Sequence, residues 1–416
     1  MELYEQIESL CNNAQAAAAK LALASTEQKN AALLKIAEAL RENTETIVNE
    51  NKRDLEAAES NGVAKAMIDR LMLNEKRIEG ICASLVDVTK LDDPIGTGDA
   101  WERPSGLHIK RVRVPLGVVA IIYEARPNVT VDSAALCLKT GNAVVLRGGK
   151  EAICTNTALV SVMKKALDSC EFDPHCIELV TSTERESANI LMTMRGKVDV
   201  LIPRGGKGLI KSVVENAKVP VIETGAGNCH LYVDDSADME MALNIAVNAK
   251  CSRPSVCNAI ETVLVHAGVA AKFLPAFAEK MKNFDVEIRG CAKTRVLIPD
   301  ATEATEEDFY TEYNDYIVAV RVVDTLTDAI VHVNKYSTGH SEAIVTGDKA
   351  HGERFQREVN SAAVYVNAST RFTDGGEFGF GAEIGISTQK LHVRGPMGLS
   401  ALTTEKYLID GEGSVR

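Results

Sequence analysis

Long hydrophobic runs are absent from this 416-residue chain, whose longest uninterrupted apolar stretch is Val118–Tyr123. A helix that crosses a bilayer needs about 20 mostly apolar residues, so no membrane span is expected. Residues 1–5 carry neither a basic flank nor an apolar core, and this predicts the absence of a secretory signal. Pairs of the C-x-x-C type are also absent, although the chain has ten cysteines. These cysteines are therefore expected to be reduced thiols in a cytoplasmic protein.

The chain has fewer basic than acidic residues: 46 lysines and arginines against 58 aspartates and glutamates, which gives a net charge of −12. An acidic surface disfavours nucleic acid and anionic membranes as partners, so neither is expected. No metal is expected either, because the closest group of zinc-ligand types (Cys170, His175 and Cys176) has no second cluster. The composition, 45% hydrophobic and 25% charged, is that of an ordinary globular protein.

Strands and helices alternate along most of the chain. Residues up to about 92 are predicted to be helical, with a capping box at Ser25 and Gln28. Strands are then predicted at 108–114, 118–122, 143–146, 177–180, 198–202, 219–222 and 261–266, near 286 and 296, and at 317–322, 343–346 and 363–366. Helices are predicted at 153–167, 185–194, 209–217, 239–250, 269–281 and 329–334. Short apolar strands joined by such helices indicate an α/β fold with doubly wound parallel sheets.

Two glycine-rich basic loops follow strands of the predicted sheet. Arg147-Gly-Gly-Lys150 follows one strand, and Arg204-Gly-Gly-Lys-Gly208 follows another and opens a helix. Backbone N–H groups at such a turn can bind an anion. The two loops are therefore interpreted as binding a phosphate-bearing ligand rather than as turns without a ligand. Neither G-x-G-x-x-G nor a Walker A sequence is present, so an ordinary Rossmann fingerprint and an NTPase loop are both unsupported.

Cys257 lies in a short turn between a predicted helix and a predicted strand, beside Arg253 and Pro254. A nearby cation or helix end favours the thiolate, which is the attacking form of a cysteine nucleophile. The alternative is an inert, buried thiol, which is the more common state of a cysteine.

Four motifs resemble the aldehyde dehydrogenase superfamily, and within it the family of gamma-glutamyl phosphate reductases. They are Tyr-Glu-Ala-Arg-Pro-Asn at 123–128, Glu-Thr-Gly-Ala-Gly-Asn at 223–228, Ser-Arg-Pro-Ser-Val-Cys-Asn-Ala at 252–259, and the run at 328–344. The resemblance implies an aldehyde dehydrogenase-like fold of two doubly wound domains and a small β arm. Residues 1–100 with 119–228 would bind the dinucleotide, 229–390 would be catalytic, and 101–118 with 391–416 would be the oligomerisation arm.

The resemblance also implies catalytic roles. Cys257 falls on the family's nucleophile, and Asn128 on the asparagine that shares the oxyanion hole with the Cys257 backbone N–H. Asn128 has a second interpretation as the N-cap of a helix that begins near residue 131. Glu223 falls on the glutamate that activates water in acid-forming relatives, and it is interpreted here as a structural group or a proton manager.

NADPH is the cofactor that the resemblance and the charges favour. Lys150 stands where NAD-preferring relatives carry a glutamate, and a lysine would attract the 2′-phosphate of NADP. The other expected cofactor residues are Arg147, Arg204, Gly205, Gly206, Gly208, Glu312 and Phe378. For Glu312, a solvated carboxylate in an acidic stretch is nearly as good an interpretation.

The implied reaction is NADPH-dependent reduction of L-glutamate 5-phosphate to L-glutamate 5-semialdehyde through a cysteine thioester, the second step of proline biosynthesis. Glu124, Arg126, Arg253 and His340 are the expected substrate-binding residues, although a packed surface role for His340 is the more common fate. The alternatives are a hydrolytic NAD(P)-dependent aldehyde dehydrogenase, a thiol hydrolase or transferase, and a non-catalytic assembly protein. The resemblance further implies functional coupling to glutamate 5-kinase.

A homo-oligomer is expected, either a dimer or a multiple of dimers. Residues 108–114 and 399–409 each show one polar face and have no obvious partner in a doubly wound sheet. Unpaired sheet edges are usually covered, and relatives use the matching segments to join subunits.

Overall fold

The computed structural model describes residues 2–63 and 65–416, which form two compact units. Unit 1 comprises Met1–Thr224, Gly379–Gly385 and Met397–Arg416, and unit 2 comprises Gly225–Phe378 and Ile386–Pro396. The functional names of the predicted domains stay predictions, because packing alone defines these units. No helix of the described residues is long and apolar enough to cross a membrane.

Unit 1 is built on a four-stranded parallel sheet in the order β5-β4-β3-β6. The strands are β3 (Val118–Tyr123), β4 (Ala143–Arg147), β5 (Ile177–Leu179) and β6 (Val200–Arg204). The helices that follow them are α6 (Pro127–Lys139), α7 (Ile153–Ser169), α8 (Arg185–Met192) and α9 (Lys207–Asn216). Before the sheet come α1 (Leu3–Leu21), α2 (Thr26–Glu42), α3 (Thr44–Ser60), α4 (Lys65–Leu71) and α5 (Glu75–Lys90).

Helices cover both faces of the unit 1 sheet. Val118, Ala120 and Ile122 of β3 share one core with residues of α1, α8 and α9. Side chains alternate across a strand, so Val119 and Ile121 face the other side, where α6 lies against β3 and β4. α2 and α5 pack on α6 as an outer layer, and α2 begins at the predicted capping box.

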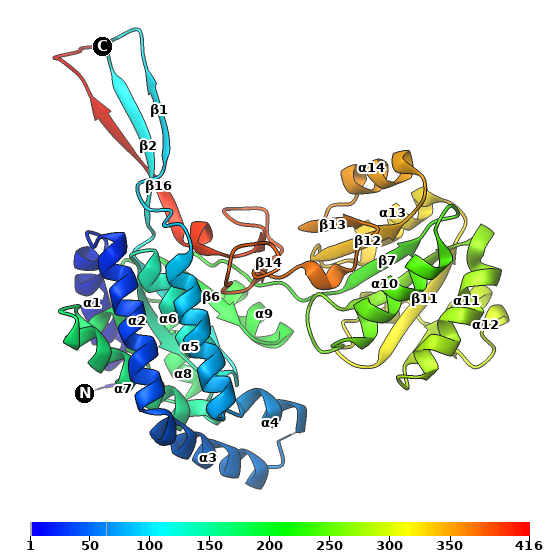
Figure 1. The fold of residues 1–416 in the computed structure, drawn as a ribbon, viewed down its shortest axis with the longest axis horizontal. Helices are drawn as coiled ribbons and strands as arrows, with labels where there is room; N and C mark the ends of the chain where they lie inside the picture. Colours follow the sequence, from blue (N-terminus) through cyan, green and yellow to red (C-terminus); the bar gives the residue numbers. More distant parts are fainter. Residues whose placement is uncertain (1, 64) are drawn as a thin grey trace. The chain divides into compact units, whose positions relative to one another are not determined.

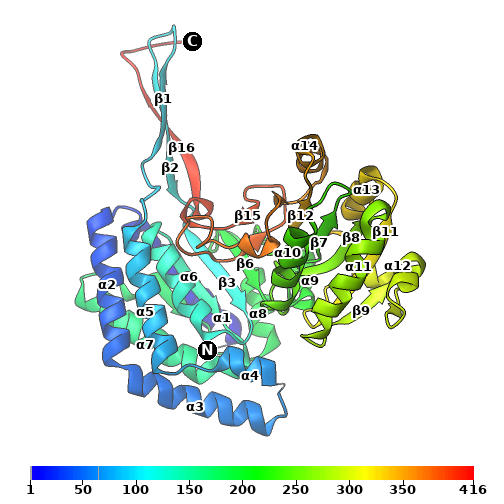
Figure 2. The same ribbon diagram turned by 45° about the vertical axis from the view of Figure 1, so that its right-hand side comes forward.

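A separate three-stranded antiparallel sheet extends away from the helices of unit 1 (Figures 1 and 2). Its order is β1-β2-β16, with β1 (Gly98–Glu102), β2 (His108–Pro115) and β16 (Thr403–Asp410). The two segments that were expected to lack a partner in the parallel sheet therefore pair with each other. Residues 399–402 of the predicted arm form a 3₁₀ turn before β16 begins.

Unit 2 contains a seven-stranded parallel sheet in the order β10-β9-β11-β8-β7-β12-β13. The strands are β7 (Cys229–Val233), β8 (Ile260–His266), β9 (Glu287–Gly290), β10 (Thr302–Glu303), β11 (Ile317–Val323), β12 (Ser341–Val345) and β13 (Ala363–Val366). The helices are α10 (Met239–Cys251), α11 (Ala267–Lys282), α12 (Ala292–Leu297), α13 (Leu326–Tyr336) and α14 (Lys349–Glu358). A short hairpin, β14 (Ile386–Ser387) and β15 (Gly395–Pro396), completes the unit.

This sheet is also doubly wound, as Figure 2 shows. Leu231 and Val263 share a core with residues of α10 and α11, whereas their neighbours Tyr232 and Leu264 pack with α13 and α14. The predicted fold class, an α/β protein with parallel doubly wound sheets, is confirmed in both units.

Two predicted strands are wrong. Residues 219–222 form a single bridge between Val221 and Leu201, because Pro220 has no N–H with which to extend a ladder. Val296 lies in the short helix α12, where its side chain is 80% exposed. Thr294, Val296 and Ile298 alternate along the sequence as in a strand. Thr294 and Ile298 are buried and Val296 is exposed, which is the i, i+4 pattern of a helix rather than the single face of a strand.

Candidate active site

Cys257 lies, half-buried, in the turn between α10 and β8, at the amino end of β8 in unit 2. The segment that enters β7 packs tightly on this turn. A Cβ on Gly227 would lie 1.5 Å from the carbonyl oxygen of Cys257, so no side chain fits at position 227. The neighbouring Cys229 thiol donates a hydrogen bond to the same carbonyl oxygen at 3.1 Å.

Arg371 clamps the Cys257 turn at both ends. Its Nε donates to the Ser252 hydroxyl at 3.1 Å, and its guanidinium also donates to the side-chain oxygen of Asn258. Asn258 returns a hydrogen bond to the Arg371 carbonyl at 3.2 Å. Burial, and then the charge of Arg253, lower the pKa of Arg371, while Cys257 opposes the shift. Two guanidinium groups therefore act electrostatically at the turn, of which the sequence predicted Arg253 alone.

We expect Arg371→Met to slow alkylation of Cys257 by iodoacetamide about tenfold at neutral pH, because a nearby cation favours the reactive thiolate. The measurement is the labelling rate of Cys257, followed by peptide mass spectrometry across pH. Arg357→Met, at an exposed position of α14, is the matched control. Equal labelling rates in Arg371→Met and the unmodified protein would show that Arg371 has no electrostatic role.

Glu312 supports the same turn from another direction. Its Oε1 accepts a hydrogen bond from the Gly227 backbone N–H at 2.7 Å. The side chain is thus half-buried and bonded, and the interpretation of Glu312 as a solvated carboxylate is wrong. Two residues later, the Asn314 N–H donates to Glu261 Oε1 at 3.1 Å. Glu261 also forms a buried ion pair with Lys250, whose Nζ lies 2.6 Å from Oε2.

His340 is fully buried just before β12, so the expectation of a packed surface histidine is wrong. Its Nδ1 lies 2.8 Å from the Ser341 hydroxyl and 3.8 Å from the sulfur of Cys229, which contacts the Cys257 carbonyl. His340 lies behind the Cys257 turn. The expected contact of His340 with the substrate stays a prediction.

Asn128 lies in unit 1, in the first turn of α6. Arg126 occupies the N-cap position and Pro127 follows it, so the N-cap interpretation of Asn128 is wrong. The exposed side-chain amide of Asn128 donates to Asp132 Oδ2 at 3.0 Å, which orients it. Burial raises the pKa of Asp132 to about 6, against the opposing effects of Asn128 and Arg204. Asn128 and Cys257 belong to different units, so their joint oxyanion role stays a prediction.

The second glycine loop holds a carboxylate. Gly206 is the N-cap of α9, and its N–H donates to Glu124 Oε2 at 2.9 Å. A Cβ on Gly205 would meet the Glu124 carboxyl carbon at 2.7 Å, so the glycine permits this close approach. Arg204 ends β6 beside the loop, and Gly208, which has open space around it, lies in the first turn of α9. Glu124 thus contacts the second glycine loop, and its expected role in binding the substrate stays a prediction.

The first glycine loop presents Lys150 to solvent at the start of a 3₁₀ turn. Arg147, by contrast, is engaged within the protein. Its guanidinium donates to the carbonyls of Thr183 and Glu184 at 3.1 and 2.9 Å, and to the Ser187 hydroxyl at 3.2 Å. Arg147 thus fixes the loop before α8, and burial lowers its pKa.

Glu223 and Phe378 lie at the chain crossings between the units. Glu223 is half-buried, one residue before the end of the first unit 1 segment. Phe378, the last residue of its unit 2 segment, is exposed, and its N–H donates to the Asp374 carbonyl at 2.9 Å. Their assigned roles stay predictions.

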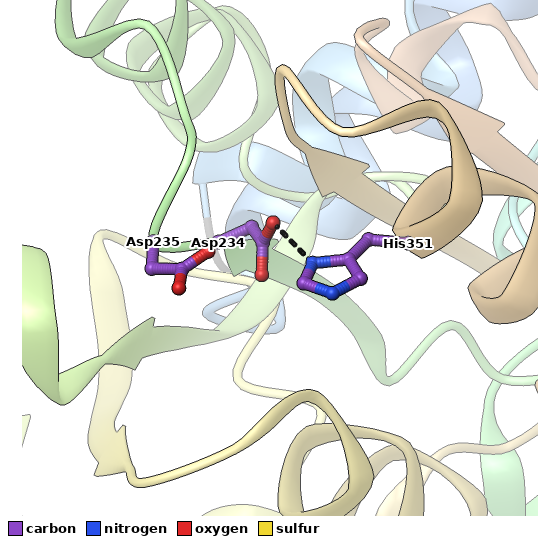
Figure 3. A group of neighbouring side chains, drawn as sticks. All are labelled: Asp234, Asp235 and His351. Carbon is purple, nitrogen blue, oxygen red and sulfur yellow. Dashed lines mark hydrogen bonds and ion pairs between the residues drawn. The ribbon is translucent and has the colours of Figure 1, made fainter.

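A second polar cluster, of Asp234, Asp235 and His351, lies at the carboxyl end of β7 (Figure 3). The Cys257 turn lies at the amino end of the neighbouring parallel strand β8. Asp234 accepts hydrogen bonds from His351 at 2.9 Å, Tyr232 at 3.0 Å, Ser236 at 2.9 Å and Thr346 at 2.7 Å. The hydrogen bond to Asp234 raises the pKa of His351. Four donors already satisfy the Asp234 carboxylate, so we interpret this cluster as a structural link between β7, β12 and α14.

The chain matches the model of the aldehyde dehydrogenase family over residues 3–306. It is 60% identical to a gamma-glutamyl phosphate reductase of Carboxydothermus hydrogenoformans, over 99% of this chain and 100% of the relative. It is 55% identical to one of Clostridium acetobutylicum over the full length of both chains. The crystal structure of gamma-glutamyl phosphate reductase from Thermotoga maritima superposes with a TM-score of 0.97, at 48% identity over 99% of each chain. The chain therefore belongs to the aldehyde dehydrogenase family and, within it, to the gamma-glutamyl phosphate reductases.

Proposed function

We propose that this protein catalyses the NADPH-dependent reduction of L-glutamate 5-phosphate to L-glutamate 5-semialdehyde and phosphate, the second step of proline biosynthesis. The observation that carries the proposal is the 60% identity over 99% of the chain with a relative named for this activity. The position of Cys257 in a clamped turn beside Arg253 and Arg371 supports it, because an acyl phosphate needs a nucleophile and nearby cations.

Cys257 is the proposed nucleophile. Its thiolate attacks the acyl carbon, the C–S bond forms, and phosphate leaves with the electron pair of the broken C–O bond. The Asn128 amide and the Cys257 backbone N–H stabilise the transient oxyanion, and each such donor contributes about 3–4 kcal/mol. Bound NADPH supplies the hydride that reduces the thioester. The resulting thiohemiacetal on Cys257 collapses to the semialdehyde and returns the thiol.

The contact with Glu124 supports the second glycine loop as a binding site for an anion. The Glu124 carboxylate accepts a hydrogen bond from the Gly206 N–H at the start of α9, so this N–H group already binds a negatively charged group of the same chain. In addition, Nε of Arg204 is buried and has no hydrogen-bond partner in the described part of the chain. These residues fit a pyrophosphate, which would take the place of the Glu124 carboxylate. Lys150 would hold the 2′-phosphate.

Replacement of Lys150 by Glu should weaken NADPH binding about tenfold to a hundredfold while affecting NADH much less, since a charge-assisted contact to phosphate is lost. The measurement is the Kd of each cofactor for both proteins at fixed ionic strength. Lys52→Glu, on α3, controls for the general change of charge. Equal weakening of both cofactors, or a preference of the unmodified protein for NADH, would remove Lys150 as the discriminating residue.

We also propose a homo-oligomer, a dimer or a multiple of dimers, joined through the β1-β2-β16 sheet. Among the described strands none pairs with the outer edges of β1 and β16, and Trp101, Tyr407, Leu408 and Ile409 are exposed there. Replacement of both Leu408 and Ile409 by Glu should shift the mass measured by light scattering towards that of a monomer. Val296→Glu, on α12, is the control. A monomeric unmodified protein at micromolar concentration would contradict the proposal.

Coupling to glutamate 5-kinase and a cytoplasmic location also remain proposals. The location is supported by the cysteines, all ten of which lie in the described part of the chain as thiols without disulfides.

The product of the reverse reaction separates this proposal from a hydrolytic aldehyde dehydrogenase in which Glu223 activates water. The protein is incubated with L-glutamate 5-semialdehyde, NADP and phosphate and is then removed by filtration. Hydroxylamine is added to the filtrate to trap an acyl phosphate, because in the presence of the protein it would also react with the thioester. We expect the gamma-glutamyl hydroxamate only when phosphate was present. Free glutamate, formed equally well without phosphate, would favour the hydrolytic reaction.

A further inference from the structure

We propose that a cavity beside the Cys257 turn binds the α-amino and α-carboxylate groups of the glutamyl substrate. The proposal rests on the proposed function and assigns the part of the substrate that does not react. The cavity has a volume of about 450 Å³ and lies entirely within unit 2. It is formed at the amino ends of β12 and β13, together with the loop of the β14–β15 hairpin.

Two cations from the hairpin loop line one side of the cavity. Lys390 is exposed, and Arg394 donates to the side-chain and backbone oxygens of Asn360 at 3.2 and 2.9 Å. Neither cation is paired with a carboxylate of the described residues. No aspartate or glutamate is among the lining residues, so this side of the cavity suits an anionic group.

Hydrogen-bond acceptors rather than cations line the cavity at the start of β12. The hydroxyls of Ser337 and Ser361 line the cavity, and both donate to Oε1 of Glu342, in the second case at 3.1 Å. The hydrogens of both hydroxyls are directed to Glu342. The Ser361 oxygen therefore offers lone pairs to the cavity, and the Ser337 oxygen offers the lone pair that is not occupied by the Gly339 N–H, which donates to it at 2.8 Å. Glu342 is fully buried beneath them, and its Oε2 accepts from His230 N at 2.7 Å. Acceptors above a buried carboxylate suit an ammonium group.

The wall of the cavity is hydrogen-bonded to the segment that packs on the Cys257 turn. Thr338, on the cavity wall, donates to the Ala226 carbonyl at 2.5 Å and accepts from Asn228 N at 3.0 Å. Between these two residues lies Gly227, whose Cα packs against the carbonyl of Cys257. A glutamyl chain therefore has an anchoring site for its amino-acid end on the same edge of the sheet as the nucleophile.

A phosphate group would fit this cavity less well. It needs donors on all sides, whereas one side here presents acceptors over the negative charge of Glu342. An α-amino acid carries both charges on one carbon and matches both sides. The chemical class indicated is therefore the zwitterionic end of an amino acid.

The test compares two aldehydes in the NADP-reducing direction at saturating phosphate. L-Glutamate 5-semialdehyde carries both charged groups, and butanal ends at the carbon that bears them. For Lys390→Gln we expect kcat/KM with the semialdehyde to fall about tenfold to a hundredfold, with butanal unchanged. Arg394→Gln should behave similarly, but its bonds to Asn360 make it the less clean variant. Lys349→Gln, an exposed lysine on α14, is the matched control.

Three results would overturn the assignment. An equal loss for both aldehydes would mean a general structural defect, a rise in KM for phosphate alone would mark a phosphate subsite, and an unchanged kcat/KM for both would leave Lys390 without a role. If the unmodified protein reduces no NADP with the semialdehyde, the proposed function fails first. Calorimetric titration with L-glutamate then decides: binding that is lost in Lys390→Gln supports the amino-acid site, and no binding to the unmodified protein overturns it.

Discussion

Cys257→Ala is expected to lower turnover by about 10³-fold or more while leaving NADPH binding largely intact. The expected loss is large because the C–S bond is the covalent intermediate, and no other group in the described part of the Cys257 turn offers a thiol. Cofactor binding should persist, since both glycine loops belong to unit 1 and Cys257 to unit 2.

The measurements are steady-state turnover and the Kd of NADPH for the same preparation. Cys154→Ala, a half-buried cysteine of α7, is the matched control and should retain its activity. Near-normal turnover in Cys257→Ala, or substrate protection of a different cysteine from alkylation, would contradict the assignment.

Breaking the ion pair of Lys250 and Glu261 should produce the largest loss of stability. Both side chains are fully buried, and they lie 2.6 Å apart between α10 and β8. Burial raises the pKa of Glu261 to about 7, and Lys250 opposes this shift. Removal of one partner leaves an uncompensated buried charge, so Lys250→Met should lower the free energy of unfolding by about 3–5 kcal/mol.

The double variant Lys250→Met with Glu261→Leu should recover most of that loss, because it buries no charge. A deficit of about 1 kcal/mol should remain, since the Asn314 N–H loses its acceptor. The measurement is denaturant unfolding of the three proteins. A single variant that loses less than about 1 kcal/mol, or a double variant worse than either single one, would show that the pair does not behave as a buried ion pair.

The same pair connects stability to the site. Asn314 has a positive φ of 55°, a backbone conformation that few residues other than glycine adopt. Its N–H donates a hydrogen bond to Glu261. The loop thus fixed carries Glu312, which bonds to Gly227 against the Cys257 turn. Loss of Glu261 should therefore reduce turnover as well as stability.

The sequence predicted those features that depend on neighbours along the chain. The strand and helix alternation, the Cys257 turn and both glycine loops lie where local patterns placed them. The strands predicted at 219–222 and near Val296 were wrong. Apolar, β-branched runs resemble strands in sequence, but Pro220 cannot extend a ladder and Val296 is exposed on a helix.

Local sequence patterns could not predict contacts between segments that are far apart along the chain. Arg371 reaches Ser252 across 119 residues, and Glu124 reaches Gly206 across 82. Neither contact leaves a mark in local periodicity. The burial of His340 similarly follows from the packing of β12 against β7, which the order of strands along the chain does not reveal.

The dependence of NADP reduction on inorganic phosphate tests the central claim most directly. With L-glutamate 5-semialdehyde as substrate, phosphate is the group that must release the acyl chain from Cys257. The rate should therefore rise with phosphate to saturation and extrapolate to near zero without it. A steady rate that is the same with and without phosphate would mean that water releases the acyl group, and it would contradict the assignment of this protein as an acyl-phosphate reductase.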